Sequence, residues 1–408
     1  MSARADNLRS AAAVRAAGQR MLVEAIAGEL ECWSLQLDRL PEVARYVADV
    51  TRQSYPDLRV PFHSRWRHFN VAGFDRWSKI AKTRLFRSAR DRARTEYDLA
   101  IISVLLDAGS GGVWRYLDRE TGSSLAASEG LALASLDLFA SGTLSAMPGD
   151  PLRADATRLA AITQDEVAAA FQVTSTNPLA GLEGRVALLN RLGHVCQSAA
   201  SWFHRDDTVR PGHLFDKAAE SADSASGIPA PRLLRLVLDG LGPIWPSRVV
   251  IDGVGLGDAW PYPRWDTNAE RGIVPFHKLS QWLTYSLIEP SEAAGISVTD
   301  MDGLTALAEY RNGGLFVDLG VVEPRSPDDL ARAHEAGSPL IVEWRALTVA
   351  LIDRLAPLVR AELGMPAGAM PLASLLQGGT WSAGRKIANL RRQGGQPSIQ
   401  IVSDGTTF

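Results

Sequence analysis

The side chains of catalytic type gather between positions 278 and 311. Lys278 and Gln281 lie one turn apart in a segment with helical periodicity, and Glu309 and Arg311 flank Tyr310 further along. A carboxylate near a lysine and an arginine suits a site that holds an anionic sugar and keeps a negative charge beside the reacting carbon. We therefore take Glu309 and Lys278 as catalytic candidates, and Gln281 and Arg311 as substrate-binding candidates.

The turn Thr299-Asp300-Met301-Asp302 separates these two groups. Asp302 is a further substrate-binding candidate. If Glu309 is not the catalytic carboxylate, Asp302 and Asp258 are the next ones to test. A purely structural ion pair between Lys278 and Glu309 is the alternative interpretation.

Residues 61–69 hold two histidines, two arginines and three aromatic residues. Trp66 and its aromatic neighbours could wall a flat leaving group, with His63 and Arg65 making polar contacts to it. The same aromatic residues could equally belong to the core. A zinc site at His63 and His68 lacks a third ligand, so no metal is expected.

Residues 249–258 read V-V-I-D-G-V-G-L-G-D, a strand followed by spaced glycines. A dinucleotide-binding turn would need a helix to begin at once, but Pro261 and Pro263 follow. We interpret the glycines as a tight loop past a pocket, with Asp258 and Trp260 in the lining. Nucleotide-binding, zinc-protease and serine-hydrolase motifs are absent, and no cofactor is expected.

Ten basic residues and only two acidic ones, Asp75 and Asp91, lie between Arg65 and Arg94. Such a stretch could bind nucleic acid, could hold a substrate phosphate, or could be a solvated helix face balanced by acids elsewhere. Because the net charge of the chain is −3, nucleic-acid binding is not expected.

The composition is that of an ordinary globular protein, with 46% hydrophobic and 22% charged residues in 408. We predict one compact domain over residues 1–408, with a surface loop at 217–231.

Two cysteines, Cys32 and Cys196, allow at most one disulfide and suit a reducing cytoplasm. The N-terminus lacks the apolar core of a signal peptide, and no window approaches twenty apolar residues, so a soluble cytoplasmic protein without membrane contact is expected. The oligomeric state stays open.

Helical periodicity dominates the chain, so a mainly α, multi-helix globular fold with a few short β-strands is predicted. The expected helices are 7–28, 41–54, 86–107, 126–140, 179–193, 231–240, 275–288, 302–311 and 339–362. The expected strands are 32–37, 248–252 and 397–402.

The segments F-H-K-L-S-Q (276–281) and T-A-L-A-E-Y-R (305–311) resemble the blocks F-x-K-R-A-Q and T-x-F-A-D-Y-R of queuosine salvage proteins, which are queuosine-5′-phosphate N-glycosidases. Here Glu309 stands in place of an aspartate and is one methylene longer. The whole chain is similar to the uracil-catabolism protein 4 family, of which the run H-S-R-W-R-H-F at 63–69 is a hallmark.

The distant resemblance implies a DNA-glycosylase-like helical architecture. It also implies that Glu309 stabilises the sugar cation and orients the attacking water. Lys278 would either pair with Glu309 and lower its pKa, or contact the sugar hydroxyls. Trp381 follows Gln377-Gly-Gly-Thr where the relatives have a leucine–tryptophan motif, so it would cover one wall of the site, with the glycines letting the backbone approach; core packing is the alternative. Glu343 and Arg345 match the relatives' G-S … E-x-R and would form two separate buried ion pairs.

The closer resemblance implies a reaction within uracil degradation. The expected activity is N-glycosidase hydrolysis of ribosylurea 5′-phosphate, giving urea and ribose 5-phosphate. The expected partner is thus a small phosphorylated riboside. A non-catalytic protein that binds a nucleotide or a pathway enzyme is the alternative from another class.

Overall fold

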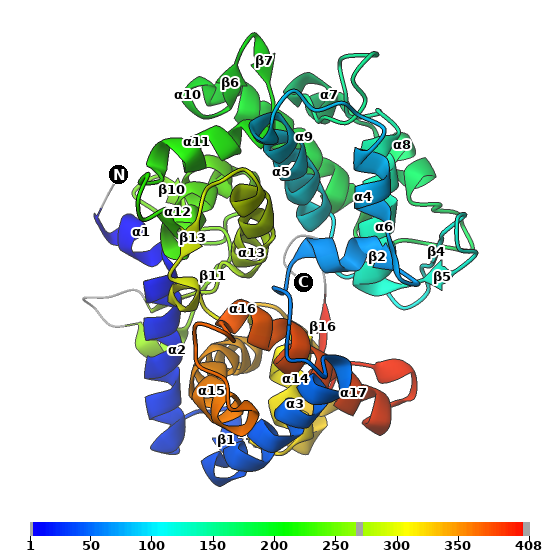
Figure 1. The fold of residues 1–408 in the computed structure, drawn as a ribbon. Coiled ribbons are helices and arrows are strands. Elements are labelled where there is room, and N and C mark those ends of the chain that lie inside the picture. Colours follow the sequence, from blue (N-terminus) through cyan, green and yellow to red (C-terminus); the bar gives the residue numbers. More distant parts are fainter. Residues whose placement is uncertain (1–2, 267–271, 403–408) are drawn as a thin grey trace. The chain divides into compact units, whose positions relative to one another are not determined.

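The computed structural model describes residues 3–266 and 272–402, and these form a mainly α protein with short, scattered strand pairs (Figure 1). Contacts divide the chain into two compact units, each built from segments distant in sequence. The first takes residues up to His63, then Ser247–Gln281 and Asp300–Val402; the second takes Ser64–Pro246 and Trp282–Thr299. The predicted single domain stays a prediction, as does kinship with DNA glycosylases.

The first unit is organised by α15 (Pro339–Leu363), which is buried along most of its length. Helices α2 (Ala11–Ile26), α3 (Leu40–Ser54) and α14 (Tyr310–Asp318) pack against α15, and α17 (Trp381–Arg391) packs against α14. Between α15 and α17 lie α16 (Leu372–Ser374) and the π-helix η8 (Leu375–Thr380). The remaining elements of this unit are α1 (Ala3–Leu8), the 3-10 turns η1 (Leu37–Arg39), η5 (Pro263–Trp265), η6 (Met301–Gly303), η7 (Pro327–Leu330) and η9 (Gln393–Gly395), and the strands β1 (Trp33–Leu35), β9 (Val250–Ile251), β10 (Val254–Gly255), β11 (Ala259–Pro261), β12 (Ile273–Pro275), β14 (Val322–Pro324), β15 (Ala333–Glu335) and β16 (Gln400–Val402).

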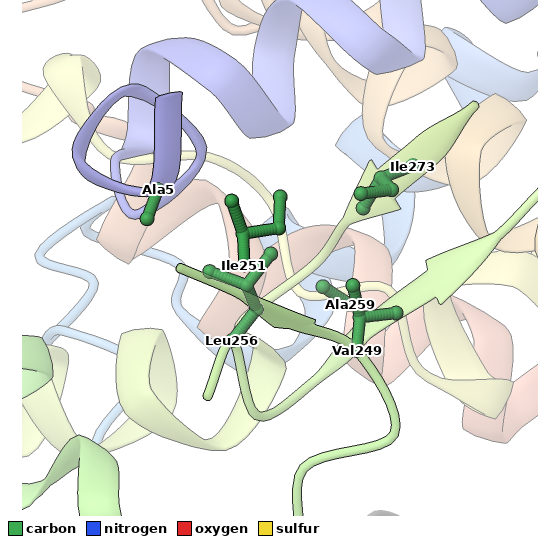
Figure 2. Packing of buried hydrophobic residues seen from close by; sticks show 6 residues of the cluster. All are labelled: Ala5, Val249, Ile251, Leu256, Ala259 and Ile273. Atoms are coloured by element: carbon green, nitrogen blue, oxygen red, sulfur yellow. The ribbon is translucent and has the colours of Figure 1, made fainter. Parts of the chain in front are cut away.

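A small apolar cluster supports the loop that carries Asp258 (Figure 2). It consists of Ala5, Val249, Ile251, Leu256, Ala259 and Ile273. The cluster joins α1 to the hairpin β9–β10 and to the antiparallel pair β11–β12, in which Trp260 faces Val274. Because residues on both sides of Asp258 are packed in this cluster, the backbone there is held on both sides.

The second unit centres on α5 (Ala89–Leu105), which packs against α6 (Ala127–Ala140), α9 (Leu182–Ser198) and α11 (Leu214–Ser221). Gly193 lets α9 cross α7 (Ala156–Ala161) closely, since a Cβ there would lie 2.3 Å from the Ala160 nitrogen. Helix α13 (Lys278–Ala293) begins in the first unit and continues into the second. The remaining elements are α4 (Arg76–Ala81), α8 (Gln164–Ala170), α10 (Ala200–Phe203), α12 (Ala230–Leu241), η2 (Arg65–Phe69), η3 (Pro211–His213), η4 (Gly242–Ile244), β2 (Asn70–Val71), β3 (Phe74–Asp75), β4 (Tyr116–Leu117), β5 (Ser124–Leu125), β6 (His204–Arg205), β7 (Thr208–Val209), β8 (Ile228–Pro229) and β13 (Val298–Thr299).

Several predicted elements need correction. The helix predicted at 302–311 is wrong, because η6 is followed by a non-helical buried segment and α14 begins only at Tyr310. The helix predicted at 7–28 is two helices, since Ser10 caps the start of α2. The loop predicted at 217–231 shrinks to residues 222–227, between α11 and β8. None of the described helices is both long and apolar enough to cross a membrane.

Candidate functional site

Glu309 is the N-cap of α14, and its carboxylate is held by the backbone of that helix. Oε2 accepts a hydrogen bond from the Arg311 nitrogen at 2.8 Å, and Oε1 accepts one from the Asn312 nitrogen at 2.5 Å. The residue is 6% exposed. Two amide donors and the positive end of the helix dipole therefore fix a buried carboxylate in one place.

The pKa of Glu309 is raised above its ordinary value because burial disfavours the charged form. Hydrogen bonds from the two backbone amides and the positive charges of Lys278 and Arg311 each lower that pKa, without reversing the effect of burial. The expected lowering by Lys278 is present, but the effect of burial is larger, so the pKa of Glu309 is raised. A raised pKa makes the Glu309 carboxylate a better proton acceptor than an exposed glutamate.

Asp258 has the opposite electrostatic environment. Its two carboxylate oxygens accept from the guanidinium of Arg345 at 2.9 and 2.8 Å, a bidentate pair. The Trp260 indole nitrogen donates to the same carboxylate at 2.8 Å, and the Lys278 backbone nitrogen donates at 3.0 Å. Burial would raise the pKa of Asp258, but the Arg345 charge and these hydrogen bonds hold it well below its ordinary value.

The segment before Glu309 is tied to the same framework. The Arg345 Nε donates to the Ala308 carbonyl at 3.3 Å, and the Arg345 guanidinium lies over the Phe276 ring at 3.9 Å. Gln281 exchanges hydrogen bonds with Thr305, accepting from its backbone nitrogen at 2.9 Å. Lys278, the first residue of α13, and Glu309, at the start of α14, are thereby held in one network.

A second group in the first unit surrounds the π-helix. The His63 Nδ1 lies 2.8 Å from the Gln377 Oε1, and the His63 ring lies 5.7 Å from the Trp381 ring. The Arg385 guanidinium lies 5.6 Å from the Trp381 ring centroid. Burial lowers the pKa of His63 to about 4, so this imidazole is neutral near pH 7. His63 and Trp381, two of the substrate-binding candidates, thus lie next to each other.

The side chains of two candidates, Asp302 and Arg311, make hydrogen bonds to groups other than the Glu309 carboxylate. Asp302 accepts from the Arg360 guanidinium at 2.6 Å and from the Leu372 nitrogen at 2.7 Å, which ties η6 to the start of α16. The Arg311 guanidinium donates to the Gly395 carbonyl at 2.8 Å. Their roles toward a substrate stay predictions.

The prediction of two buried ion pairs at Glu343 and Arg345 is half confirmed. Arg345 pairs with Asp258, but Glu343 accepts from the Tyr262 hydroxyl at 2.7 Å and from the Cys32 backbone nitrogen at 3.1 Å. Neutral donors satisfy Glu343 because it faces the loop before β1 rather than a basic side chain.

Arg65 and Trp66 belong to the second unit. The Arg65 guanidinium is fully buried and donates to Asp107 and to the Ser103 hydroxyl, both at 2.7 Å. The Trp66 indole donates to the Ser286 carbonyl at 2.7 Å. Both side chains have structural partners, and their substrate-binding roles stay predictions.

Seven of the ten basic residues in segment 65–94 form ion pairs with acidic side chains, which favours the predicted alternative of a face balanced by acids elsewhere. Beyond Arg65, the pairs are Arg67–Glu289, Arg76–Asp118, Lys79–Glu120, Arg84–Asp150, Arg92–Glu96 and Arg94–Asp216. Each of these pairs lies within the second unit. Within residues 3–266 and 272–402, no group of three or more histidine, cysteine or acidic side chains is arranged to hold a metal ion.

No sequence pattern marked Asn312, Gln377 or Thr380 as a neighbour of the candidate residues, although they contact Glu309, His63 and Asn312 respectively. Asn312 gave no signal because a helix was expected to end at residue 311, whereas α14 begins at Tyr310, two residues before Asn312. Gln377 and Thr380 lie in a Gly-Gly segment that is typical of a loop.

The fold and site together define a mainly α protein with a buried carboxylate fixed at a helix N-terminus. The chain belongs to the family described as "Protein of unknown function (DUF1688)", whose pattern matches residues 7–408. It is similar to "Protein urg3" of Schizosaccharomyces pombe, with 38% identity over 97% of this chain and 96% of that protein. It is also similar to "Uracil catabolism protein 4" of Lachancea kluyveri, with 34% identity over 95% of this chain and 94% of that protein.

Proposed function

We propose that this protein is an N-glycosidase of uracil catabolism that hydrolyses ribosylurea 5′-phosphate to urea and ribose 5-phosphate. The observation that carries the proposal is the Glu309 carboxylate, buried and fixed by two backbone amides, with the charge of Lys278 in its surroundings. The pathway comes from the name of the second relative, "Uracil catabolism protein 4", and the substrate rests on the resemblance to that family.

The reaction breaks the bond between C1′ of the ribose and a urea nitrogen. Positive charge develops on the sugar as this bond lengthens, and a fixed carboxylate beside C1′ stabilises it. A water molecule then supplies its oxygen to C1′ and gives one proton to Glu309. Glu309 passes this proton on to the departing nitrogen, so that urea leaves neutral and the carboxylate is ionised again. The raised pKa of Glu309 favours its acceptance of the proton from water.

Lys278 has two effects in this scheme. Its charge lowers the pKa of Glu309 and so favours the ionised form that the sugar cation requires. Its ammonium group is also a donor suited to sugar hydroxyls or to the phosphate of the substrate. Asp258 fixes the start of α13 through the Lys278 backbone, which places the lysine.

The test is incubation of the purified protein with ribosylurea 5′-phosphate, followed by measurement of urea and of ribose 5-phosphate. Equal amounts of both products are expected, and Glu309→Gln should form them far more slowly. Ribosylurea without phosphate and uridine monophosphate should be run in parallel. Turnover of uridine monophosphate alone would keep the reaction class and remove the proposed substrate.

A second candidate function is non-catalytic binding of a nucleotide or a pathway enzyme. It is favoured by the same hydrogen bonds, because a glutamate that only caps α14 would also accept from both amides. Calorimetric binding of ribosylurea 5′-phosphate or uridine monophosphate, without release of urea or reducing sugar, would support it over the glycosidase.

A further inference from the structure

The π-helix η8 (Leu375–Thr380) packs closely against α3 and against the segment that follows α3. A Cβ on Gly378 would lie 2.8 Å from Val60 Cγ1, and one on Gly379 would lie 2.9 Å from Val47 Cγ1. The Thr51 hydroxyl donates to the Gly378 carbonyl at 3.1 Å. The glycines therefore let the π-helix approach α3, and the approach of their backbone to the site stays a prediction. Such one-turn π-helices often occur at functional sites.

The last residue of the π-helix reaches the helix that Glu309 caps. The Thr380 hydroxyl donates to the Asn312 Oδ1 at 2.9 Å. The Asn312 Nδ2 donates to the Leu307 carbonyl at 3.1 Å, and the Asn312 backbone nitrogen donates to the Glu309 Oε1. Thr380 and Asn312 are both fully buried, so water does not compete for these hydrogen bonds.

The chemistry of these groups fixes the Asn312 carboxamide in one orientation. The Leu307 carbonyl can only accept, so it requires the NH2 group of Asn312, and the amide oxygen then faces Thr380. With Thr380 on one side and Leu307 on the other, Asn312 is tethered at both ends of its side chain. Its backbone N–H is consequently held toward the Glu309 carboxylate.

We infer that Thr380 is a positioning residue for Glu309, acting through Asn312, and that the π-helix serves to present it. This inference rests on the proposed function of Glu309. A carboxylate that must face C1′ of a bound sugar loses up to ~10²-fold in rate when it is displaced by ~1 Å. Thr380 thus supports the rate of the chemical step rather than the binding of substrate.

The test compares Thr380→Val, which removes the donor at constant shape, with Thr380→Ser, which keeps it. With ribosylurea 5′-phosphate as substrate, the valine variant should lose ~10-fold or more in kcat, with KM changed by less than ~2-fold. The serine variant should retain most of the wild-type kcat. Because a loosened Asn312 bonds Glu309 less well, the acidic limb of the pH–rate profile should move upward in the valine variant.

Thr348→Val is the matched control. Thr348 is 2% exposed, lies in the same unit, and donates its hydroxyl only to a carbonyl of its own helix, that of Trp344 at 2.8 Å. This control should lower the thermal midpoint about as much as Thr380→Val while leaving kcat and the acidic limb unchanged. A structural role for Thr380 would make the two valine variants behave alike.

Wild-type kcat and an unmoved acidic limb in Thr380→Val would overturn the inference and leave the proposed function intact. Absence of turnover in the wild-type protein would overturn the proposed function and this inference with it. If Thr380→Val does not fold, Thr380→Cys replaces it, because a thiol is a weak donor of similar size. An intermediate kcat would then support the inference, and a wild-type kcat would overturn it.

Discussion

Replacing Glu309 by glutamine separates the charge of this residue from its size. Glutamine keeps one acceptor oxygen but presents an NH2 group in place of the other, so one of the two amides of α14 loses its acceptor. The loss of one cap hydrogen bond lowers the free energy of unfolding by about 1 kcal/mol. Loss of the negative charge at C1′ should lower kcat by ~10² or more, about 3 kcal/mol of activation free energy.

The substitution Glu309→Asp separates the role of this side chain as the N-cap of α14 from its proposed catalytic role. Aspartate is a better N-cap than most residues, so α14 should stay capped and stability should be kept. Its carboxylate is, however, about 1.5 Å shorter in reach, and displacements near ~1 Å can reduce rates by up to ~10²-fold. We expect partial activity with unchanged stability, which no account based on capping alone predicts.

Both variants should be assayed by urea release from ribosylurea 5′-phosphate, with thermal unfolding measured on the same preparations. Glu42→Gln, an exposed carboxylate in the first turn of α3, is the control for a lost negative charge elsewhere in the unit. Near-normal turnover in Glu309→Gln would refute the reasoning. The carboxylate would then have to be another one, and Asp258 would be tested next.

Three further predictions follow from the charges of the first unit. Because the pKa of Glu309 is raised by burial, the acidic limb of kcat/KM should lie above pH 4.5, the ordinary value for glutamate, and Lys278→Met should move it further upward. Asp258→Asn should lower the free energy of unfolding by about 3 kcal/mol in urea denaturation, because Arg345 is left buried without its carboxylate. Burial lowers the pKa of His63 from 6.5 to about 4, so the folded state binds fewer protons between these values. The free energy of unfolding should therefore fall as pH falls from 6.5 to 4, by roughly 3 kcal/mol, and His63→Gln should remove that part of the loss.

The bounds of a helix could be predicted from the sequence where a strong hydrophobic periodicity determines the helix. The helices predicted at 339–362 and 41–54 match α15 and α3 within a residue at each end. Both have apolar faces that pack in the same core, so their local pattern and their tertiary surroundings agree.

The backbone conformation could not be predicted from the sequence where it depends on hydrogen bonds to residues distant along the chain. Residues 304–308 are apolar and helix-compatible, yet they form a buried non-helical segment. Arg345 binds the Ala308 carbonyl and Gln281 binds the Thr305 nitrogen, so these backbone groups are satisfied without a helix. Glutamate is also not among the preferred N-caps, so nothing local marked Glu309 as the start of α14.

The conformation of the Gly378-Gly379 pair also depends on residues distant along the chain. Adjacent glycines in a sequence are typical of a loop, and the segment was not expected to be helical. In the structure they lie inside a π-helix, because only residues without a Cβ fit against Val60 and Val47. The residues that require glycine there are more than three hundred positions away, so no window of sequence contains the cause.

Asp258 and Glu309 were both candidates for the catalytic carboxylate, and their surroundings now separate them. Asp258 is neutralised by a bidentate arginine and its pKa is lowered, so it stays ionised and engaged in holding Arg345 and the start of α13. Glu309 is held by neutral backbone amides, and its pKa is raised. When two carboxylates have environments that push their pKa values apart, the one with the raised pKa is suited to exchange a proton and the one with the lowered pKa to hold a fixed charge. This difference is the physical ground for assigning proton transfer to Glu309 and structure to Asp258 in the proposed reaction.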